Sequence, residues 1–263
     1  MFALNFSRRV TLALRALFAG VMIALASATS ASAETVRIVA KPSFMTEGYD
    51  IIPKKDSVLG RLEAETLRHF NVLLLVNKDA KGEHAQTMTV MRPGKSRCRG
   101  CNWEATDIWD VSTGREQQES RDFTTTPVGI YQLDRDRFFK EYTTTTWDNA
   151  QMPYSMFWRF LEDGGETGWA VHAATGKGIG NLGKRNSGGC IRLHPDNAES
   201  LFRELLQDHR GGVPVFDWSS NLGEVKRREN GRLEMTKGIK ALLVVEDSDG
   251  LTYEALDTTS NES

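Results

Sequence analysis

The chain has 263 residues, of which 40% are hydrophobic and 26% are charged. This composition excludes an intrinsically disordered chain, and the length suffices for one substantial core with small segments at its ends. The formal net charge is -2, so no global basic field exists that would draw the protein to nucleic acid or to an anionic membrane surface.

The first 33 residues have the three parts of an export signal. Arg8 and Arg9 supply positive charge, residues 16–28 form a short apolar stretch, and residues 31–33 form the small-residue motif ASA. An uncleaved membrane anchor is the alternative, but the apolar stretch is short for a membrane span. We therefore expect a periplasmic mature protein that begins at Glu34 and has no stable membrane insertion.

Export places the three cysteines in an oxidising compartment. Cys98 and Cys101, in the segment SRCRGCN, are expected to form a local disulfide. A redox motif or half of a zinc site is the alternative, but the chain has no second ligand pair at zinc spacing. Cys190 is then left without a partner, and an unpaired thiol in an exported chain requires a functional explanation.

The mature N-terminal part predicts one helix and one hairpin. Apolar residues at near-helical spacing predict a helix within residues 57–70, at the end of an N-terminal extension over residues 34–70. The runs VLLLV (residues 72–76) and TMTVM (residues 87–91) flank a polar loop and predict a β-hairpin.

Later apolar runs are short and rich in threonine and aromatic residues, which predicts a mainly β fold. These runs are VGIYQL, EYTTTTW, WAVHA, CIRL and VPVFDW. One helix interrupts them, with Asp196 as the expected N-cap, Glu199 completing a capping box, and Gly211 and Gly212 ending it. Beyond residue 218, ALLVVED and LTYEAL predict a terminal hairpin, followed by a disordered tail.

The residues that could carry chemistry lie in the segment WAVHAATGKGIGNLGKRNSGGCIRLHPDN. The five histidines fit no metal-ligand motif, and GKGIGNLG lacks the spacing of a phosphate-binding loop. No metal and no organic cofactor is therefore expected. The remaining chemistry is nucleophilic catalysis, with Cys190 as the nucleophile and His172 as the base.

Gly188 and Gly189 directly precede the cysteine and allow the backbone to approach a substrate closely. The amides of Gly189 and Cys190 are candidate donors to an oxyanion. The alternatives are a buried cysteine that acts as a small hydrophobic residue and a histidine that is satisfied in the core. The glycine-rich loop that joins His172 to Cys190 favours the catalytic interpretation.

These residues resemble the catalytic domain of the L,D-transpeptidases, the YkuD family. The signature of this family is a histidine, a variable loop, and Ser/Thr-His-Gly-Cys followed by an apolar residue and often arginine. Here His172 is followed by Ser187-Gly188-Gly189-Cys190-Ile191-Arg192, so Gly188 stands where the family usually has histidine. Upstream, TTPVGIYQL and NAQMPYSMFWRF resemble two further segments of the family.

The resemblance implies a β-sandwich-like catalytic domain over residues 71–218, with one helix after the cysteine and an extension over residues 219–263. It implies that Cys190 is the nucleophile and His172 its general base. Arg192 would hold a substrate carboxylate, or else be an ordinary surface or salt-bridged arginine. Ser187 would contact the substrate or only shape the turn.

The same resemblance implies that Tyr154 lines the substrate groove, although an aromatic residue in such a segment is more often part of the core. It also implies the reaction: attack on a peptidoglycan stem tetrapeptide, loss of the terminal D-alanine, and transfer of the acyl group to an amine. The acceptor would be a neighbouring stem peptide or an outer-membrane protein. Water as acceptor would give an L,D-carboxypeptidase or crosslink hydrolase, and a non-catalytic wall-binding module is the alternative from another class. Gly188 puts efficiency and acceptor choice in question more than the reaction class.

Overall fold

The structure is a computed structural model that describes residues 37–40, 49–54, 56–95, 97–119, 122–145, 147, 149–158, 168–217, 222–247 and 251–255. All of them belong to one compact unit, Ala33–Ser263. The expected signal peptide and the expected C-terminal tail lie outside the described residues. Among the helices that are described, none is both long and apolar enough to cross a membrane.

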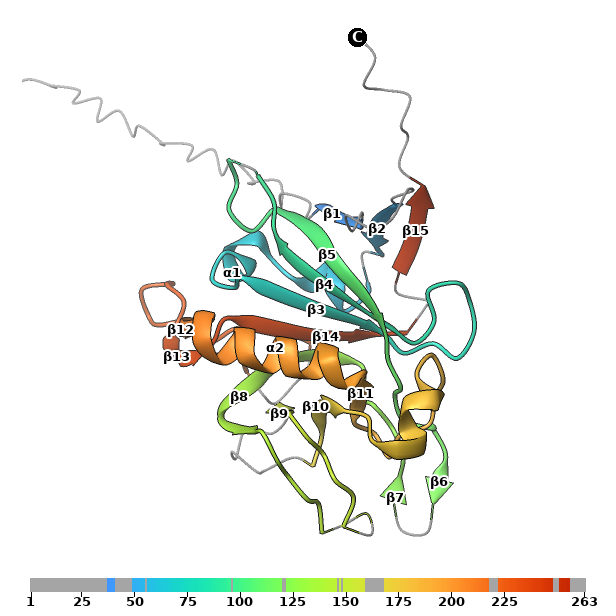
Figure 1. Ribbon diagram of the computed structural model, residues 1–263. Coiled ribbons are helices and arrows are strands. Elements are labelled where there is room, and N and C mark those ends of the chain that lie inside the picture. Colours follow the sequence, from blue (N-terminus) through green and yellow to red (C-terminus); the bar gives the residue numbers. More distant parts are fainter. Residues whose placement is uncertain are drawn as a thin grey trace, which may run out of the picture. The chain divides into compact units, whose positions relative to one another are not determined.

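Eleven strands form one mixed sheet in the order β11-β10-β9-β8-β14-β3-β4-β5-β1-β2-β15 (Figure 1). They are β1 Arg37–Ala40, β2 Tyr49–Pro53, β3 Val72–Asn77, β4 Thr87–Pro93, β5 Asn102–Asp110, β8 Gly129–Phe139, β9 Ser155–Trp158, β10 Ala170–Ala173, β11 Ile191–Leu193, β14 Ala241–Glu246 and β15 Leu251–Ala255. Two further pairs lie outside it: β6 Gln118–Glu119 with β7 Asp122–Phe123, and β12 Arg210–Pro214 with β13 Met235–Ile239. The mainly β prediction is therefore confirmed.

Alternate side chains of the central strands enter two different hydrophobic clusters, as the two-residue period of a strand requires. The inner core includes Val72, Leu74, Val76, Tyr131, Trp158, Val171, Ile191, Ala198, Leu201, Leu205, Ala241 and Leu243. The outer core includes Leu59, Leu67, Phe70, Leu73, Leu75, Val213, Phe216, Leu242 and Val244. Strands that are buried on both faces explain the continuous apolar runs VLLLV and ALLVV.

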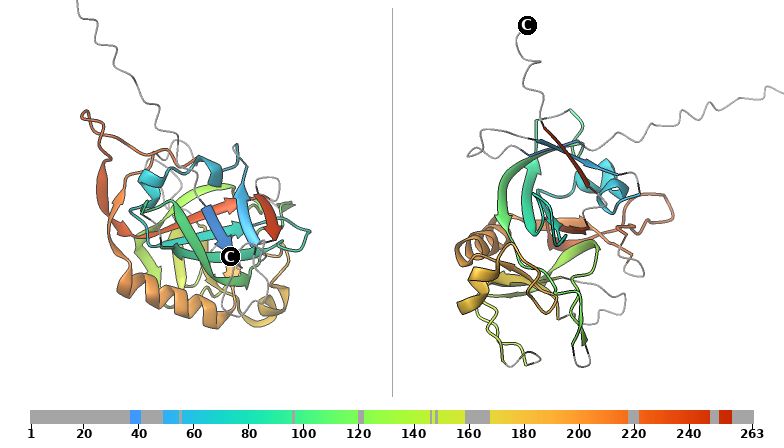
Figure 2. Two further views of the ribbon diagram at one scale, coloured as in Figure 1. Left: turned by 90° about the horizontal axis from the view of Figure 1, so that it is seen from above. Right: turned by 90° about the vertical axis from the view of Figure 1, so that its right-hand side faces the viewer.

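The inner core joins the two halves of the sheet, because it contains residues of β3 and β4 as well as residues of β9, β10 and β11. Helix α2 (Pro195–Asp208), drawn in orange, runs where these halves meet (Figure 1), and Figure 2 shows it from two further sides. The sandwich-like arrangement that was expected is thus built from one continuous sheet.

The structure places two short helical turns where one helix was expected within residues 57–70. These are the 3-10 turn η1 (Leu59–Arg61) and α1 (Ala64–Leu67). Between them the backbone is extended, with ψ of 120° at Leu62 and 143° at Glu63, so the prediction of one helix was wrong. The apolar spacing reflected burial in the outer core rather than helical periodicity.

Helix α2 is present, but its ends differ from the prediction. His194 is the N-cap and accepts a hydrogen bond from the Asp196 amide at 3.4 Å, and Pro195 occupies the first turn, where its missing N–H costs nothing. Gly211 and Gly212 lie in β12 instead of ending the helix. A preference for aspartate as N-cap was overridden by the proline that precedes it.

The prediction of a terminal hairpin is also wrong. β14 lies between β3 and β8 in the centre of the sheet, whereas β15 pairs with β2 at its edge. The described residues of the run EYTTTTW form no named strand: β8 ends at Phe139, and Thr143 forms an isolated bridge with Gln151. Because β14 is central, residue 218 does not mark a break in the sheet.

Candidate active site

Two neighbouring parallel strands bring His172 and Cys190 together. In the register of β10 and β11, His172 is paired with Arg192, and Cys190 directly precedes β11. Residues two apart on a strand share a face, so Cys190, Arg192 and His172 project to the same side of the sheet. The parallel register therefore makes the expected nucleophile and base diagonal neighbours, although 17 residues separate them in the chain.

The turn that carries Cys190 is held by the Ser187 hydroxyl. This hydroxyl donates to the Cys190 carbonyl at 2.5 Å and accepts from the Gly189 amide at 3.0 Å. Ser187 is fully buried, so it shapes the turn and does not reach a ligand. The Gly189 amide, predicted as an oxyanion donor, is thus engaged within the turn, which leaves the Cys190 amide as the remaining candidate.

A neighbouring segment, residues 111–115, supports this turn from the other side. The Thr113 carbonyl accepts hydrogen bonds from the amides of Asn186 and Ser187 at 3.0 and 2.8 Å. Ser112 and Arg192 exchange a pair of backbone hydrogen bonds at 2.9 and 3.0 Å. The turn is therefore tied to the sheet on both flanks.

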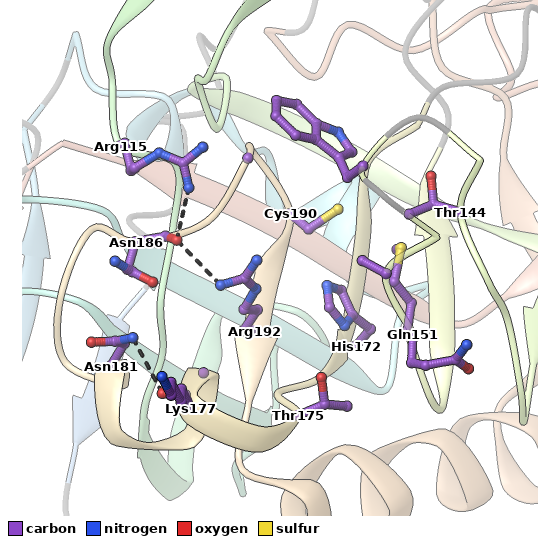
Figure 3. Close-up of a pocket in the computed structure, with 15 residues that line it drawn as sticks. Arg115, Thr144, Gln151, His172, Thr175, Lys177, Asn181, Asn186, Cys190 and Arg192 are labelled. Carbon is purple, nitrogen blue, oxygen red and sulfur yellow. Dashed lines mark hydrogen bonds between the residues drawn. The ribbon is translucent and has the colours of Figure 1, made fainter. Parts of the chain in front are cut away.

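Cys190 and His172 line a cavity of about 350 Å³. The cavity is lined by Arg115, Thr144, Trp147, Ala150, Gln151, Met152, His172, Thr175, Lys177, Gly178, Asn181, Asn186, Gly188, Cys190 and Arg192. In Figure 3, Cys190 and His172 lie between two sides, with Arg115, Asn186 and Asn181 on one and Thr144 and Gln151 on the other. None of the lining residues is acidic.

The ring of His172 is buried and has a defined tautomer. Its Nδ1 lies 2.9 Å from the Ala173 carbonyl, and because a carbonyl only accepts, Nδ1 carries the proton. In the neutral ring Nε2 then has a free lone pair. Burial lowers the pKa of His172 to about 4, and the nearby Arg192 cation adds to this effect, whereas the bond to Ala173 opposes it. At neutral pH the imidazole is therefore in its basic form.

Cys190 is a free thiol that packs at the edge of a small apolar cluster of Met152, Phe157 and Ala170. Burial raises the pKa of the Cys190 thiol, and a hydrogen bond with the Ala170 backbone and the Arg192 cation lower it by less. The thiol and the imidazole are thus both neutral at rest. This pairing suits proton transfer during attack rather than a preformed ion pair.

One side of the cavity is cationic. The guanidinium groups of Arg192 and Arg115 both donate to the Asn186 carbonyl, at 3.2 and 3.1 Å (Figure 3). Arg115 is paired with Glu119, but in the part of the chain that the structure describes no carboxylate forms an ion pair with Arg192. Lys177 lies on the same side, in the 3-10 turn η2 (Gly176–Asn181). This side can accept a carboxylate.

Gly188 borders the cavity beneath an indole. A Cβ added to Gly188 would lie 3.1 Å from Cε2 and Cζ2 of Trp147, so the indole occupies the space of the missing side chain. Trp147 comes from the loop between β8 and β9 and is 38% exposed. The glycine therefore does not leave an open gap at this wall of the cavity.

The structure does not bring Tyr154 to the cavity. Its ring packs edge-on against Phe202 of α2, with ring centroids 5.7 Å apart, and its hydroxyl forms a hydrogen bond with Glu199. Tyr154 directly precedes β9 and has a backbone φ of 53°, in the left-handed region. We assign it no role in substrate binding.

Among the cavity-lining residues that the sequence interpretation missed, three are charged or aromatic: Arg115, Trp147 and Lys177. Lys177 lies in the loop between His172 and Cys190, so its position between the two catalytic candidates was an available signal. Arg115 and Trp147 come from loops far upstream, and only the folded chain brings them to the cavity.

The expected pairing of Cys98 with Cys101 is present as a disulfide. Among the residues the structure describes, no group of three or more histidine, cysteine, aspartate or glutamate side chains is arranged to hold a metal ion.

Comparison with known proteins gives a family match. The model of the YkuD family, described as the L,D-transpeptidase catalytic domain, matches residues 73–218. No curated protein matches the chain.

Solved structures that match include an L,D-transpeptidase from Mycobacterium smegmatis, with 18% identity, a TM-score of 0.40, and coverage of 67% of this chain and 58% of that chain. L,D-transpeptidase 3 from Mycobacterium tuberculosis, in complex with a faropenem-derived adduct, matches with 16% identity, a TM-score of 0.37, and coverage of 67% and 60%. The chain thus spans about three fifths of the length of these proteins. Because the family model covers more than half of the sequence, the chain belongs to the YkuD family of L,D-transpeptidase catalytic domains.

Proposed function

We propose that this protein is a peptidoglycan L,D-transpeptidase that acts through a thioester on Cys190. The observation that carries the proposal is the arrangement at the cavity, where an unpaired thiol and a neutral imidazole project from adjacent parallel strands. Membership of the YkuD family supports peptidoglycan stem peptides as the substrate class. The donor that we propose is a stem tetrapeptide with a terminal D-alanine.

The first half-reaction forms the thioester. Nε2 of His172 takes the proton of the Cys190 thiol as sulfur attacks the carbonyl carbon of the third residue, a diamino acid. The Cys190 amide donates to the oxyanion that develops on this carbonyl. His172 then gives its proton to the nitrogen of the departing D-alanine, the C–N bond breaks, and a C–S bond remains.

The second half-reaction returns the enzyme to its starting state. An incoming amine attacks the thioester carbonyl and loses a proton to Nε2 of His172, and the sulfur leaves and regains the proton. An amine on a neighbouring stem peptide gives a 3-3 crosslink, and an amine on an outer-membrane protein attaches that protein to the wall. Water gives hydrolysis through the same residues.

Arg192 is proposed to bind a carboxylate of the substrate. Its guanidinium is partly buried, borders the cavity, and contacts the Asn186 carbonyl but no described carboxylate. A planar guanidinium can hold a carboxylate through two parallel hydrogen bonds. Lys177 and Arg115 add positive charge on the same side, which supports binding of an anionic peptide there.

The proposed site of action is the periplasm, which is where an exported protein meets peptidoglycan. The supporting observations are the export signal expected in residues 1–33 and the disulfide between Cys98 and Cys101, because disulfides persist in oxidising compartments.

The function is tested by incubating the protein that begins at Glu34 with disaccharide-tetrapeptide and identifying the products by mass spectrometry. Crosslinked dimer with loss of D-alanine is expected from the wild type. Cys190→Ala and His172→Ala should give none, whereas Tyr154→Phe, which lies outside the cavity, should remain active. Tripeptide without dimer would favour the hydrolase instead, and binding of the muropeptide without any product would favour the non-catalytic wall-binding module.

A further inference from the structure

We propose that Thr126 is a positioning residue that aims the Cys190 amide at the substrate oxyanion. The inference rests on the proposed function for its reaction, but its structural basis is separate. Thr126 is fully buried and does not line the cavity, so it can act on the substrate only through the backbone that it holds.

The hydroxyl of Thr126 has a fixed orientation. It donates to the Gly189 carbonyl at 2.7 Å and accepts from the Gly114 amide at 2.8 Å. Because a hydroxyl has a single proton, the bond from Gly114 and the bond to Gly189 together leave no freedom to rotate. Gly189 is therefore held at its carbonyl by Thr126 and at its amide by Ser187.

The backbone of Thr126 is itself clamped by an ion pair. Nζ of Lys78 donates to the Thr126 carbonyl at 2.8 Å and to Oε1 of Glu116 at 2.9 Å. The same Oε1 accepts from the Thr126 amide at 3.1 Å. Lys78 is buried and Glu116 is partly buried, so screening by water is weak and the clamp is rigid.

The bond to the Gly189 carbonyl determines where the next amide points. The peptide between Gly189 and Cys190 is trans and planar, so the Cys190 N–H points opposite to the Gly189 C=O. Because that carbonyl accepts from the buried Thr126, the Cys190 N–H points away from Thr126. Cys190 itself lines the cavity, so the proposal directs this N–H toward the substrate oxyanion.

Gly189 allows this close approach. Its φ is +127°, and a Cβ at this position would lie 2.6 Å from the Thr125 carbonyl and 2.7 Å from Nε1 of Trp169. Any side chain would push the turn away from Thr125 and Trp169. The segments TTPVG and SGGC are far apart in the sequence, but they pack together and jointly fix the orientation of the Gly189–Cys190 peptide.

The test compares Thr126→Val, which removes the hydroxyl at nearly constant volume, with Thr126→Ser, which retains it. Two reactions of Cys190 are measured for each protein. Acylation by p-nitrophenyl acetate passes through an oxyanion, and it requires no peptidoglycan substrate. Alkylation by iodoacetamide forms no oxyanion and reports only the reactivity and accessibility of the thiol. Circular dichroism confirms that each variant is folded.

For Thr126→Val we expect the acylation rate to fall by about tenfold to a hundredfold, because the donor is misdirected rather than deleted. Its alkylation rate should stay within about twofold of the wild type, and Thr126→Ser should resemble the wild type in both reactions. Equal losses of acylation and alkylation, or acylation that is unchanged in the valine variant, would overturn the inference. Absence of turnover of disaccharide-tetrapeptide by the wild type would contradict the proposed function instead.

Discussion

At the scale of single residues, the protonation states of Cys190 and His172 distinguish the proposed mechanism from one that starts from an ion pair. Burial raises the pKa of the thiol and lowers that of the imidazole to about 4. Neutral forms of both groups are therefore favoured at pH 7, and in the proposed mechanism the proton moves to His172 only as sulfur attacks.

This state predicts the pH dependence of Cys190 alkylation by iodoacetamide. The rate should rise with pH and reach half of its maximum above about pH 8.5, the ordinary pKa of a thiol. The measurement is a series of pseudo-first-order rates between pH 5 and 10, with Cys190→Ala as the blank. A plateau that is already complete at pH 7 would show a thiolate–imidazolium pair and contradict the neutral resting state.

Gly188 and Trp147 form a second residue-scale prediction. In Gly188→Ala the new Cβ would lie 3.1 Å from two carbon atoms of the Trp147 indole. This distance is shorter than an ordinary van der Waals contact, so the indole must shift. We expect kcat/KM for transfer to fall several-fold in Gly188→Ala, and to fall much less when the same change is made in a Trp147→Ala background. The coupling should be about 1 kcal/mol. Additive effects in this double-mutant cycle would mean that the indole does not limit residue 188.

The sequence predicted Cys190 and His172 because their chemistry is specific and a short loop joins them. Trp147 could not be predicted, because its contact with Gly188 depends on the path of the loop between β8 and β9. Tyr154 shows the opposite error: the resemblance placed it at the cavity, whereas it packs against Phe202 and the inner core, which was the alternative interpretation.

At the scale of elements, burial was easier to predict than pairing. The runs VLLLV and ALLVV identified β3 and β14 because strands buried on both faces must be apolar throughout. The neighbours of these strands in the sheet could not be predicted in the same way, since the periodicity of a strand contains no information on its pairing partners. The predicted pairing of β3 with β4 is present, whereas β14 pairs with β3 and β8 instead of with β15.

Helix α2 packs against β10, the strand that carries His172, and this contact gives an element-scale prediction. Leu205 is fully buried in the inner core, whereas the adjacent Leu206 is only partly buried. Leu205→Ala should lower the free energy of unfolding by about 2–5 kcal/mol because it leaves a cavity, and Leu206→Ala should lower it by clearly less. Denaturant unfolding at equilibrium measures both, and similar losses would contradict the assigned packing.

At the scale of the whole molecule, a buried carboxyl ties the N-terminal segment to the central sheet. Glu246, at the end of β14, accepts a hydrogen bond from the Leu59 amide and is 2% exposed. Burial raises its pKa to about 7, and the neighbouring Asp247 adds to the shift. This contact could not be predicted from the sequence, because the two residues lie far apart in the chain.

The raised pKa predicts how stability depends on pH. Between about pH 4.5 and 7 the unfolded chain loses the Glu246 proton while the folded protein keeps it, so stability falls as pH rises. The loss should be nearly complete at pH 8 and amount to about 3 kcal/mol. Glu246→Gln stays neutral and can still accept from Leu59, so its stability at pH 8 should exceed that of the wild type. Parallel stability curves for the two proteins between pH 5 and 8 would contradict this role.

The central claim is that Cys190 carries the acyl group of a stem peptide, and trapping that intermediate tests it most directly. The protein is mixed with disaccharide-tetrapeptide, quenched in acid, and analysed by intact mass and peptide mapping. The account predicts a mass increase equal to the substrate minus alanine, located on the peptide that contains Cys190 and absent from Cys190→Ala. An adduct on another residue, or products that form in the Cys190→Ala protein, would contradict the account.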